Sequence, residues 1–202
     1  MRGRRRLLLH ACCAPCSLEP VKYLREEGFE PTICWTNPNI QPAAEHDLRL
    51  ATLLAWADEA GLPVVVAGCD RDAWERAAAP MGMRREARCR ACYAVRLAEA
   101  CRVARERGFA HVSTTLVVSP YQLFDLCHDV LGACARREGL EVVWRDFRPY
   151  YPEATDWSRE LGMYRQNYCG CRFSAAEAAV ERHERRDERK RERELRRRQA
   201  RA

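Results

Sequence analysis

Twelve cysteines distinguish this chain of 202 residues, and seven of them fall into three short groups. The groups are Cys12-Cys13 with Cys16, Cys89 with Cys92, and Cys169 with Cys171. Cysteines clustered in this way in a reducing compartment are metal ligands or redox groups more often than members of a disulfide framework. The residue pattern therefore indicates metal or thiol chemistry.

The first two groups have the spacing of metal ligands. Cys89 and Cys92 form a C-x-x-C pair immediately before a helical pattern, where two thiolates converge and a helix N-terminus helps to keep them ionised. Cys12 and Cys13 are adjacent, so both reach one centre only where the strand breaks, and the Ala-Pro that follows supplies a break. Four such thiolates complete the ligands of a [4Fe–4S] cubane or of a structural zinc site. The number of ligands leaves iron–sulfur and zinc equally open.

The third group favours redox chemistry. A disulfide between Cys169 and Cys171 would close a very short ring, and strained bridges are easily reduced. Gly170 between them relieves the backbone constraint that a side chain would impose. A free thiol pair in a turn, or extra metal ligands, are the alternatives. The remaining cysteines lie singly in apolar or helical contexts and are predicted to be small core residues: Cys34, Cys69, Cys101, Cys127 and Cys134.

Polar residues near these groups are further site candidates. His10 ends a buried strand, where a core histidine is the first interpretation and a proton donor the second. Polar density before the C-x-C turn favours a site that includes Asp146–Arg148 and Tyr164–Gln166. A separate set surrounds a turn, where substrate binding and a helix cap with an ion pair are equally open: Asn37, Asn39, Glu45 and Arg49.

Apolar runs alternate with amphipathic segments along the chain. Strands are expected at 7–12, 31–35, 63–67, 111–116 and 141–144, and helices at 18–27, 43–60, 92–107 and 121–138. This alternation predicts a mostly parallel, doubly wound, Rossmann-like α/β sheet flanked by helices. Ligands bind beyond the carboxyl ends of the strands in such sheets, and the first cysteine group directly follows the first strand.

Positive charge is concentrated at the two ends of the chain. The net charge is +6, yet residues 2–6 hold four Arg and residues 175–202 hold 11 Lys/Arg against 7 Asp/Glu, which leaves residues 7–174 at −2. Basic arms favour a polyanion such as RNA, and solubility is the alternative. We expect an α/β metalloenzyme domain at 1–174 and a basic tail at 175–202 that is helical or disordered.

Other classes of protein are disfavoured. No run reaches the ~18 apolar residues of a membrane span. The leucines after the first arginines are too few for a signal peptide. A cytoplasmic protein that does not associate with a membrane is therefore expected. The phosphate-binding loops of P-loop, dinucleotide-binding and ATP-pyrophosphatase proteins are absent from the sequence. Nucleotide-driven chemistry is therefore disfavoured.

Six motifs, in this order, resemble the cobalamin-independent (QueH-type) epoxyqueuosine reductases. They are LLLHACCAPCS (7–17), NPNIQPAAEHDLR (37–49), RCRACYAVRL (88–97), STTLVVSPYQ (113–122), DFRPYY (146–151) and YRQNYCGCRFS (164–174). That family reduces epoxyqueuosine to queuosine at the wobble position of the tRNA anticodon, the last step of queuosine biosynthesis. Its fold is similar to the Rossmann-like (HUP-like) sheets of adenine-nucleotide hydrolases.

The resemblance implies roles for the cysteines. It assigns a [4Fe–4S] cluster to Cys12, Cys13, Cys89 and Cys92, and a redox-active pair to Cys169 and Cys171. Family members are thought to hold a separate iron beside the cluster. Some have Asp at the position of Cys16, which makes Cys16 a candidate ligand of that iron. The implied partners are a tRNA carrying epoxyqueuosine and an external electron donor.

Reduction of the epoxide to an alkene and water needs two electrons and two protons. His10, Asp146 and Tyr168 are the candidate proton donors. Anticodon bases are read by stacking, for which the candidates are Tyr121, Tyr164 and Arg165. Two other functions remain open. One is a zinc-stabilised RNA-binding module without redox catalysis, and the other is a thiol–disulfide oxidoreductase that uses the C-x-C pair without a cluster.

Overall fold

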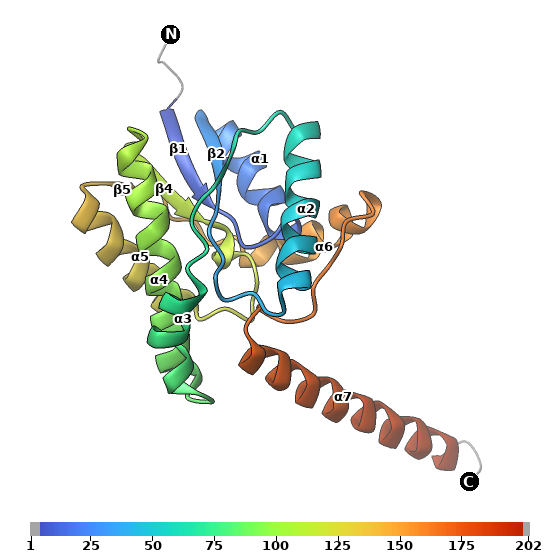
Figure 1. The fold of residues 1–202 in the computed structure, drawn as a ribbon. Helices are drawn as coiled ribbons and strands as arrows, with labels where there is room; N and C mark the ends of the chain where they lie inside the picture. Colours follow the sequence, from blue (N-terminus) through green and yellow to red (C-terminus); the bar gives the residue numbers. More distant parts are fainter. Residues whose placement is uncertain (1–4, 200–202) are drawn as a thin grey trace.

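A five-stranded parallel sheet forms the centre of the molecule, as a computed structural model of residues 5–199 describes it (Figure 1). Its strand order is β3-β2-β1-β4-β5, and every neighbouring pair is parallel. The strands are β1 (Arg5–His10), β2 (Phe29–Trp35), β3 (Val64–Val66), β4 (His111–Thr114) and β5 (Glu141–Val142). The predicted Rossmann-like α/β architecture is confirmed.

Helices cover both faces of this sheet. They are α1 (Leu18–Glu26), α2 (Ala43–Glu59), α3 (Arg71–Ala77), α4 (Arg85–Glu106), α5 (Phe124–Glu138), α6 (Tyr151–Glu160) and α7 (Arg172–Gln199). Leu8 packs toward α4, whereas Leu7 and Leu9 pack among residues of α1 and α2. Because a parallel sheet is covered on both faces, the last four residues of β1 are all buried. Within the described residues, no helix combines the length and apolar character that a membrane crossing requires.

The strand order creates a crevice beside the central strand. After β1 the chain adds β2 and β3 on one side, and β4 then pairs with β1 on the other side. The segments that leave β1 and β4 therefore lie next to each other beyond the carboxyl edge of the sheet. The amide of Cys12 donates to Thr115 Oγ1 at 3.1 Å across this junction. Ligands bind at such a switch point in open α/β sheets, which is where the first cysteine group lies.

The predicted strands and helices are present with boundaries shifted by a few residues, and two helices were not predicted. Helix α3 is capped by Asp70, whose side chain accepts from the amide of Ala73 at 2.8 Å. Helix α6 starts with a proline in its first turn. One boundary matters for the site, because α4 begins at Arg85 and not at the predicted residue 92.

Helix α7 joins the body at its first turns and then leaves it (Figure 1). Arg88 of α4, which is buried, donates to both carboxylate oxygens of Glu177 at 2.7 and 2.9 Å. The basic tail, predicted to be helical or disordered, is helical as far as Gln199. Residues 1–4, which hold part of the predicted N-terminal basic cluster, and residues 200–202 lie outside the described residues.

Candidate metal centre

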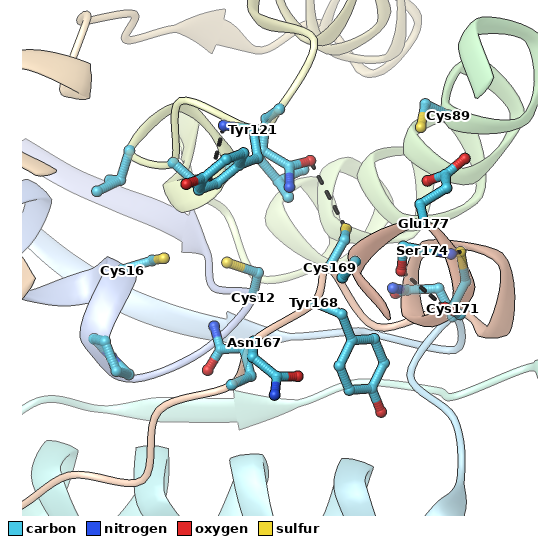
Figure 2. Close-up of a pocket in the computed structure, with 18 of the residues that line it drawn as sticks. Cys12, Cys16, Cys89, Tyr121, Asn167, Tyr168, Cys169, Cys171, Ser174 and Glu177 are labelled. Atoms are coloured by element: carbon cyan, nitrogen blue, oxygen red, sulfur yellow. Dashed lines mark hydrogen bonds between the residues drawn. The ribbon is translucent and has the colours of Figure 1, made fainter. Parts of the chain in front are cut away.

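The three cysteine groups meet around one cavity of about 360 Å³ (Figure 2). The segment after β1, helix α4 and the loop before α7 each contribute two of its cysteines. The six that line it are Cys12, Cys16, Cys89, Cys92, Cys169 and Cys171. Segments that are far apart in the sequence thus present thiols to a common space.

Cys12, Cys13 and Cys16 form the tightest thiol group. Their Sγ atoms all lie within 4.8 Å of one another, and Cys12 and Cys16 point their sulfurs toward each other in Figure 2. The strand ends at His10, and a short 3-10 turn at Pro15–Ser17 bends the chain. This break lets two adjacent cysteines reach the same point, as the Ala-Pro predicted.

Hydrogen bonds among these thiols favour one thiolate. Hydrogen bonds from Cys13 and Cys16 hold the pKa of Cys12 well below its usual value, because they stabilise its charged form. The same bonds raise the pKa of Cys16 and contribute to the raised pKa of Cys13. Gln166 Nε2 also donates to Cys13 Sγ at 2.8 Å. Three close thiols, of which those of Cys13 and Cys16 are buried, form a ligand set for a soft metal.

Cys89 and Cys92 lie inside α4, three residues apart on one face. The expectation that they precede a helix N-terminus, which would keep them ionised, is wrong, since α4 starts at Arg85 and the helix dipole acts mainly on the first turn. Burial instead raises the pKa of Cys89 to about 12 and that of Cys92 to about 11. At neutral pH these two thiols therefore stay protonated until a metal ion displaces their protons.

The C-x-C loop is held against α2 by buried Arg49. Its guanidinium donates to the carbonyl oxygens of Cys169 at 2.9 Å and Tyr168 at 3.2 Å, and to Glu45 Oε1 at 2.7 Å. Arg49 therefore has a structural role. The ion pair with Glu45 that the sequence suggested is present, but it is buried and not at the surface. Cys169 and Cys171 are free thiols in this structure.

Gly170 fits a position that has no room for a side chain. Its φ is +147°, and a Cβ there would lie 2.7 Å from Asn39 Nδ2 and 3.0 Å from Ile40 Cγ1. Both neighbours are buried, so neither moves easily. The backbone oxygen of Gly170 also accepts from the amide of Gln41 at 2.9 Å. The glycine thus permits the close approach that brings Cys169 to the cavity.

Arg96 is the main site residue that the sequence analysis missed. It is 1% exposed and donates to Asn37 Oδ1 at 2.6 Å, while its Nε and Nη1 have no hydrogen-bond partner among the described residues. Burial acts to lower the pKa of Arg96, but charge on Cys92, then Cys169 and Cys12, raises it. Its position seven residues after Cys89 on the same helix face was the available signal.

This buried cation tests whether a thiolate-bound metal fits the cavity. A guanidinium with unpaired N–H groups is costly to bury unless negative charge compensates it. The described residues place no carboxylate on Arg96, whereas thiols of all three cysteine groups contribute to its environment. Thiolates held by a metal would supply that negative charge. The cysteine thiols and the buried guanidinium of Arg96 therefore fit an anionic thiolate–metal centre.

The three candidate proton donors have different positions. His10 is fully buried, its Nδ1 is 2.9 Å from Thr114 Oγ1, and burial followed by Arg96 lowers its pKa to about 3. Asp146 is a surface residue paired with Arg148 at 2.6 Å, which lowers its pKa. Neither lines the cavity, whereas Tyr168 does.

The candidate stacking residues also divide. Tyr121, which is 51% exposed, and Arg165 line the cavity. Tyr164 instead donates through its hydroxyl to Glu45 Oε2 at 2.6 Å and is not among the lining residues. Asn39 lines the cavity with both amide atoms buried and unpaired within the described structure. The predicted core cysteines are buried except Cys69, which is partly exposed.

Together, the fold and the cavity define a Rossmann-like α/β protein with a thiol-lined centre at the switch point of its sheet. The family model described as epoxyqueuosine reductase QueH matches residues 7–177, and the chain belongs to this family. The epoxyqueuosine reductase QueH of Dehalococcoides mccartyi is 32% identical over 174 residues, which cover 85% of this chain and 93% of the relative. That of Thermotoga maritima is 32% identical over 178 residues, covering 85% and 91%.

A solved structure supports the fold alone. A predicted subunit of tRNA methyltransferase from Methanocaldococcus jannaschii superposes with a TM-score of 0.53 at 14% sequence identity. The match covers 77% of this chain and 75% of the other. The Rossmann-like sheet is thus shared with a protein of very different sequence.

Replacing Gly170 with alanine should destabilise the protein. We expect Gly170→Ala to lower the free energy of unfolding by about 1–3 kcal/mol, because an L-residue is strained at this φ and its Cβ meets buried atoms. Denaturant unfolding measures the change. Gly68→Ala is the matched control, since its Cβ would make an ordinary 3.6 Å contact with Glu99. Equal effects of the two substitutions would contradict the assigned role of Gly170.

Proposed function

We propose that this chain is an iron–sulfur oxidoreductase that reduces epoxyqueuosine to queuosine in the anticodon of tRNA. The observation that carries the proposal is the meeting of cysteines from three distant segments around one cavity. Membership of the QueH family supports the substrate, since its members are named epoxyqueuosine reductases. The proposed location is the cytoplasm, where tRNA is modified and thiols stay reduced.

The proposed ligands of a [4Fe–4S] cluster are Cys12, Cys13, Cys89 and Cys92. When bound, the cluster supplies single electrons and Lewis-acidic iron. Cys16 is the proposed ligand of a separate iron, because its Sγ lies within 4.8 Å of those of Cys12 and Cys13. The buried guanidinium of Arg96 compensates part of the negative charge of the thiolates.

A zinc-stabilised RNA-binding module remains the alternative. Structural zinc sites are closed by their four ligands. Here three of the four proposed ligands, Cys12, Cys89 and Cys92, face a cavity of about 360 Å³. Tyr121, a residue exposed at the surface, also lines this cavity. Access from the surface favours a centre that meets a substrate over one that only stabilises the fold.

Oxidation of the C-x-C thiols would supply the electrons and protons that reduction of the epoxide needs. Two carbon–oxygen bonds of the epoxide break, and the oxygen leaves as water after gaining two electrons and two protons. Oxidation of Cys169 and Cys171 to a disulfide forms one S–S bond and releases the same two electrons and two protons. An external donor then reduces the disulfide. Tyr168 lines the cavity beside Cys169, but its hydroxyl donates to the backbone oxygen of Gln41 at 2.5 Å and points away from Cys169 (Figure 2). The thiols of Cys169 and Cys171 are therefore the proposed source of the two protons.

The residues around the cavity suggest how the base is held. Tyr121 and Arg165 offer an aromatic face and a planar guanidinium for stacking of an unpaired anticodon base. Asn39 offers an amide whose donor and acceptor are unpaired within the described structure. A modified base that enters between these groups reaches the thiols at the bottom of the cavity.

An anaerobic assay tests this function. Iron-reconstituted protein, a chemical reductant and tRNA carrying epoxyqueuosine should yield queuosine, detected by mass spectrometry of the nucleosides. Boiled protein and protein without iron are the controls. A reconstituted protein that holds iron yet leaves epoxyqueuosine unchanged, with several electron donors, would contradict the proposal.

Loss of one proposed ligand should remove the cluster. We expect Cys89→Ala to lose the iron–sulfur absorption and most of about four irons, because three thiolates leave one iron open. Iron analysis and visible absorption after anaerobic reconstitution measure this. Cys101→Ala is the matched control, since Cys101 lies on the same helix but is a buried core residue away from the cavity. Full iron content in Cys89→Ala would exclude Cys89 as a ligand.

Loss of the buried cation should make the cluster harder to reduce. We expect Arg96→Met to shift the reduction potential downward by at least tens of millivolts, since a buried positive charge nearby stabilises the reduced form of a redox centre. Redox titration followed by electron paramagnetic resonance measures the shift. Arg102→Met, on the exposed side of α4, should leave the potential unchanged. A potential that is the same in both variants would show that Arg96 does not act on the cluster.

A further inference from the structure

Charge is segregated along α7. At 3.6 residues per turn, most of its basic side chains fall within an arc of roughly 140° that contains no acidic residue. They are Arg182, Arg185, Arg186, Arg189, Lys190, Arg193, Arg196 and Arg197. The opposite side of the helix holds the acidic residues, which are Glu177, Glu181, Glu184, Asp187, Glu188, Glu192 and Glu194. We call the first side the basic face of α7.

The basic face begins at the cavity. Arg182 and Arg185 line the cavity together with Ala178, which precedes them on the same side of the helix. From there α7 runs away from the body (Figure 1), and at 1.5 Å per residue the face extends for roughly 20 Å to Arg196. A ligand that reaches the thiols therefore passes the start of this face and can continue along it.

Contacts at the first turns fix the direction of α7. Buried Arg88 holds Glu177 through two hydrogen bonds, and Arg182 Nη1 donates to the backbone oxygen of Asn167 at 3.4 Å. Farther along, Glu181 pairs with Arg185 at 3.7 Å within the helix, in an exposed geometry that a phosphate can displace. Helix α7 is thus anchored at the cavity while its basic face stays accessible.

The composition of α7 selects among ligands. A membrane-binding helix, or a helix that fills a protein groove, needs an apolar stripe. The exposed large apolar residues of α7 are Val180 and Leu195, and both fall on the acidic side. Recognition by the basic face therefore rests on charge. Residues 7–174 carry a net charge of −2, so the excess of positive charge lies outside the body.

We propose that the basic face of α7 binds the phosphodiester backbone of the RNA stem next to the loop whose base enters the cavity. The part of this proposal that concerns a loop base in the cavity rests on the proposed function. The family match ends at residue 177, so the part of α7 that carries the basic face lies beyond the matched segment. The helix thus adds sequence-independent affinity and orients the stem.

The test uses the full chain and a synthetic anticodon stem–loop RNA with an unmodified base. In the neutralised variant, Arg186, Arg189, Arg193 and Arg196 are replaced by Gln. We expect its affinity near 0.1 M salt to fall at least about tenfold, and the slope of log K against log salt to decrease by about 3, as for the loss of four phosphate contacts. Fluorescence anisotropy over a salt series measures both. An unchanged slope would overturn the proposal.

A second variant separates the arrangement of charge from its amount. In this variant Glu188 and Arg189 trade positions, and so do Arg193 and Glu194. The net charge is unchanged, but the basic face is broken. We expect it to bind RNA more weakly than the unchanged chain, whereas equal binding would overturn the proposal. Arg191→Gln, on the acidic side, should weaken binding less than Arg189→Gln. Circular dichroism checks that every variant keeps its helix.

The outcome is independent of the reductase. RNA affinity is measured without epoxyqueuosine, and the iron content of each variant is determined in parallel. If the unchanged chain binds RNA with the expected slope but neither holds iron nor reduces epoxyqueuosine, the proposed function fails and the docking surface stands. If it reduces epoxyqueuosine while the neutralised variant binds RNA as tightly as the unchanged chain, the docking surface fails alone.

Discussion

One asparagine links the two main cysteine-bearing segments of this protein. Asn37 donates to the carbonyl oxygen of Ala11, next to Cys12, at 2.9 Å, and accepts from Arg96 of α4 at 2.6 Å. The end of β1 and the helix that carries Cys89 are thereby joined through a fully buried amide. Buried polar groups of this kind are strong positional constraints, because an unmade hydrogen bond there is costly. The shape of the cavity depends on this link.

The same chain of contacts explains why the site is both polar and buried. Arg49 fixes the C-x-C loop by its backbone oxygens, and Arg96 places an incompletely paired cation among the thiols. An apolar side chain at the position of Arg96 would avoid the cost of burying this charge. The presence of an arginine there fits a site whose negative charge arrives with a metal. A thiolate-bound metal would therefore account both for the proposed function and for the burial of Arg96.

Much of the fold follows from local pattern. The strands were predictable because β1 and its neighbours are short apolar runs covered on both faces, and the cysteine spacing directed attention to the correct segments. The start of α4 was not predictable, since the residues from Arg85 to Cys92 are mostly charged and small and give little apolar periodicity. From the sequence alone, Arg96 and Arg49 would be assigned to the surface, because arginines are rarely buried. Their partners are distant along the chain, so only the folded structure identifies them as buried. Asp146 lay near the C-x-C turn in sequence, but its local pairing with Arg148 keeps it at the surface.

We propose that cysteines from the end of β1 and from α4 share one iron-containing centre. The most direct test is a crystal structure of protein prepared without oxygen, with anomalous scattering measured at the iron absorption edge. We expect one cluster of iron atoms bonded to the thiolates of Cys12, Cys13, Cys89 and Cys92. A single metal held by Cys12, Cys13 and Cys16, with Cys89 and Cys92 as free thiols, would contradict it.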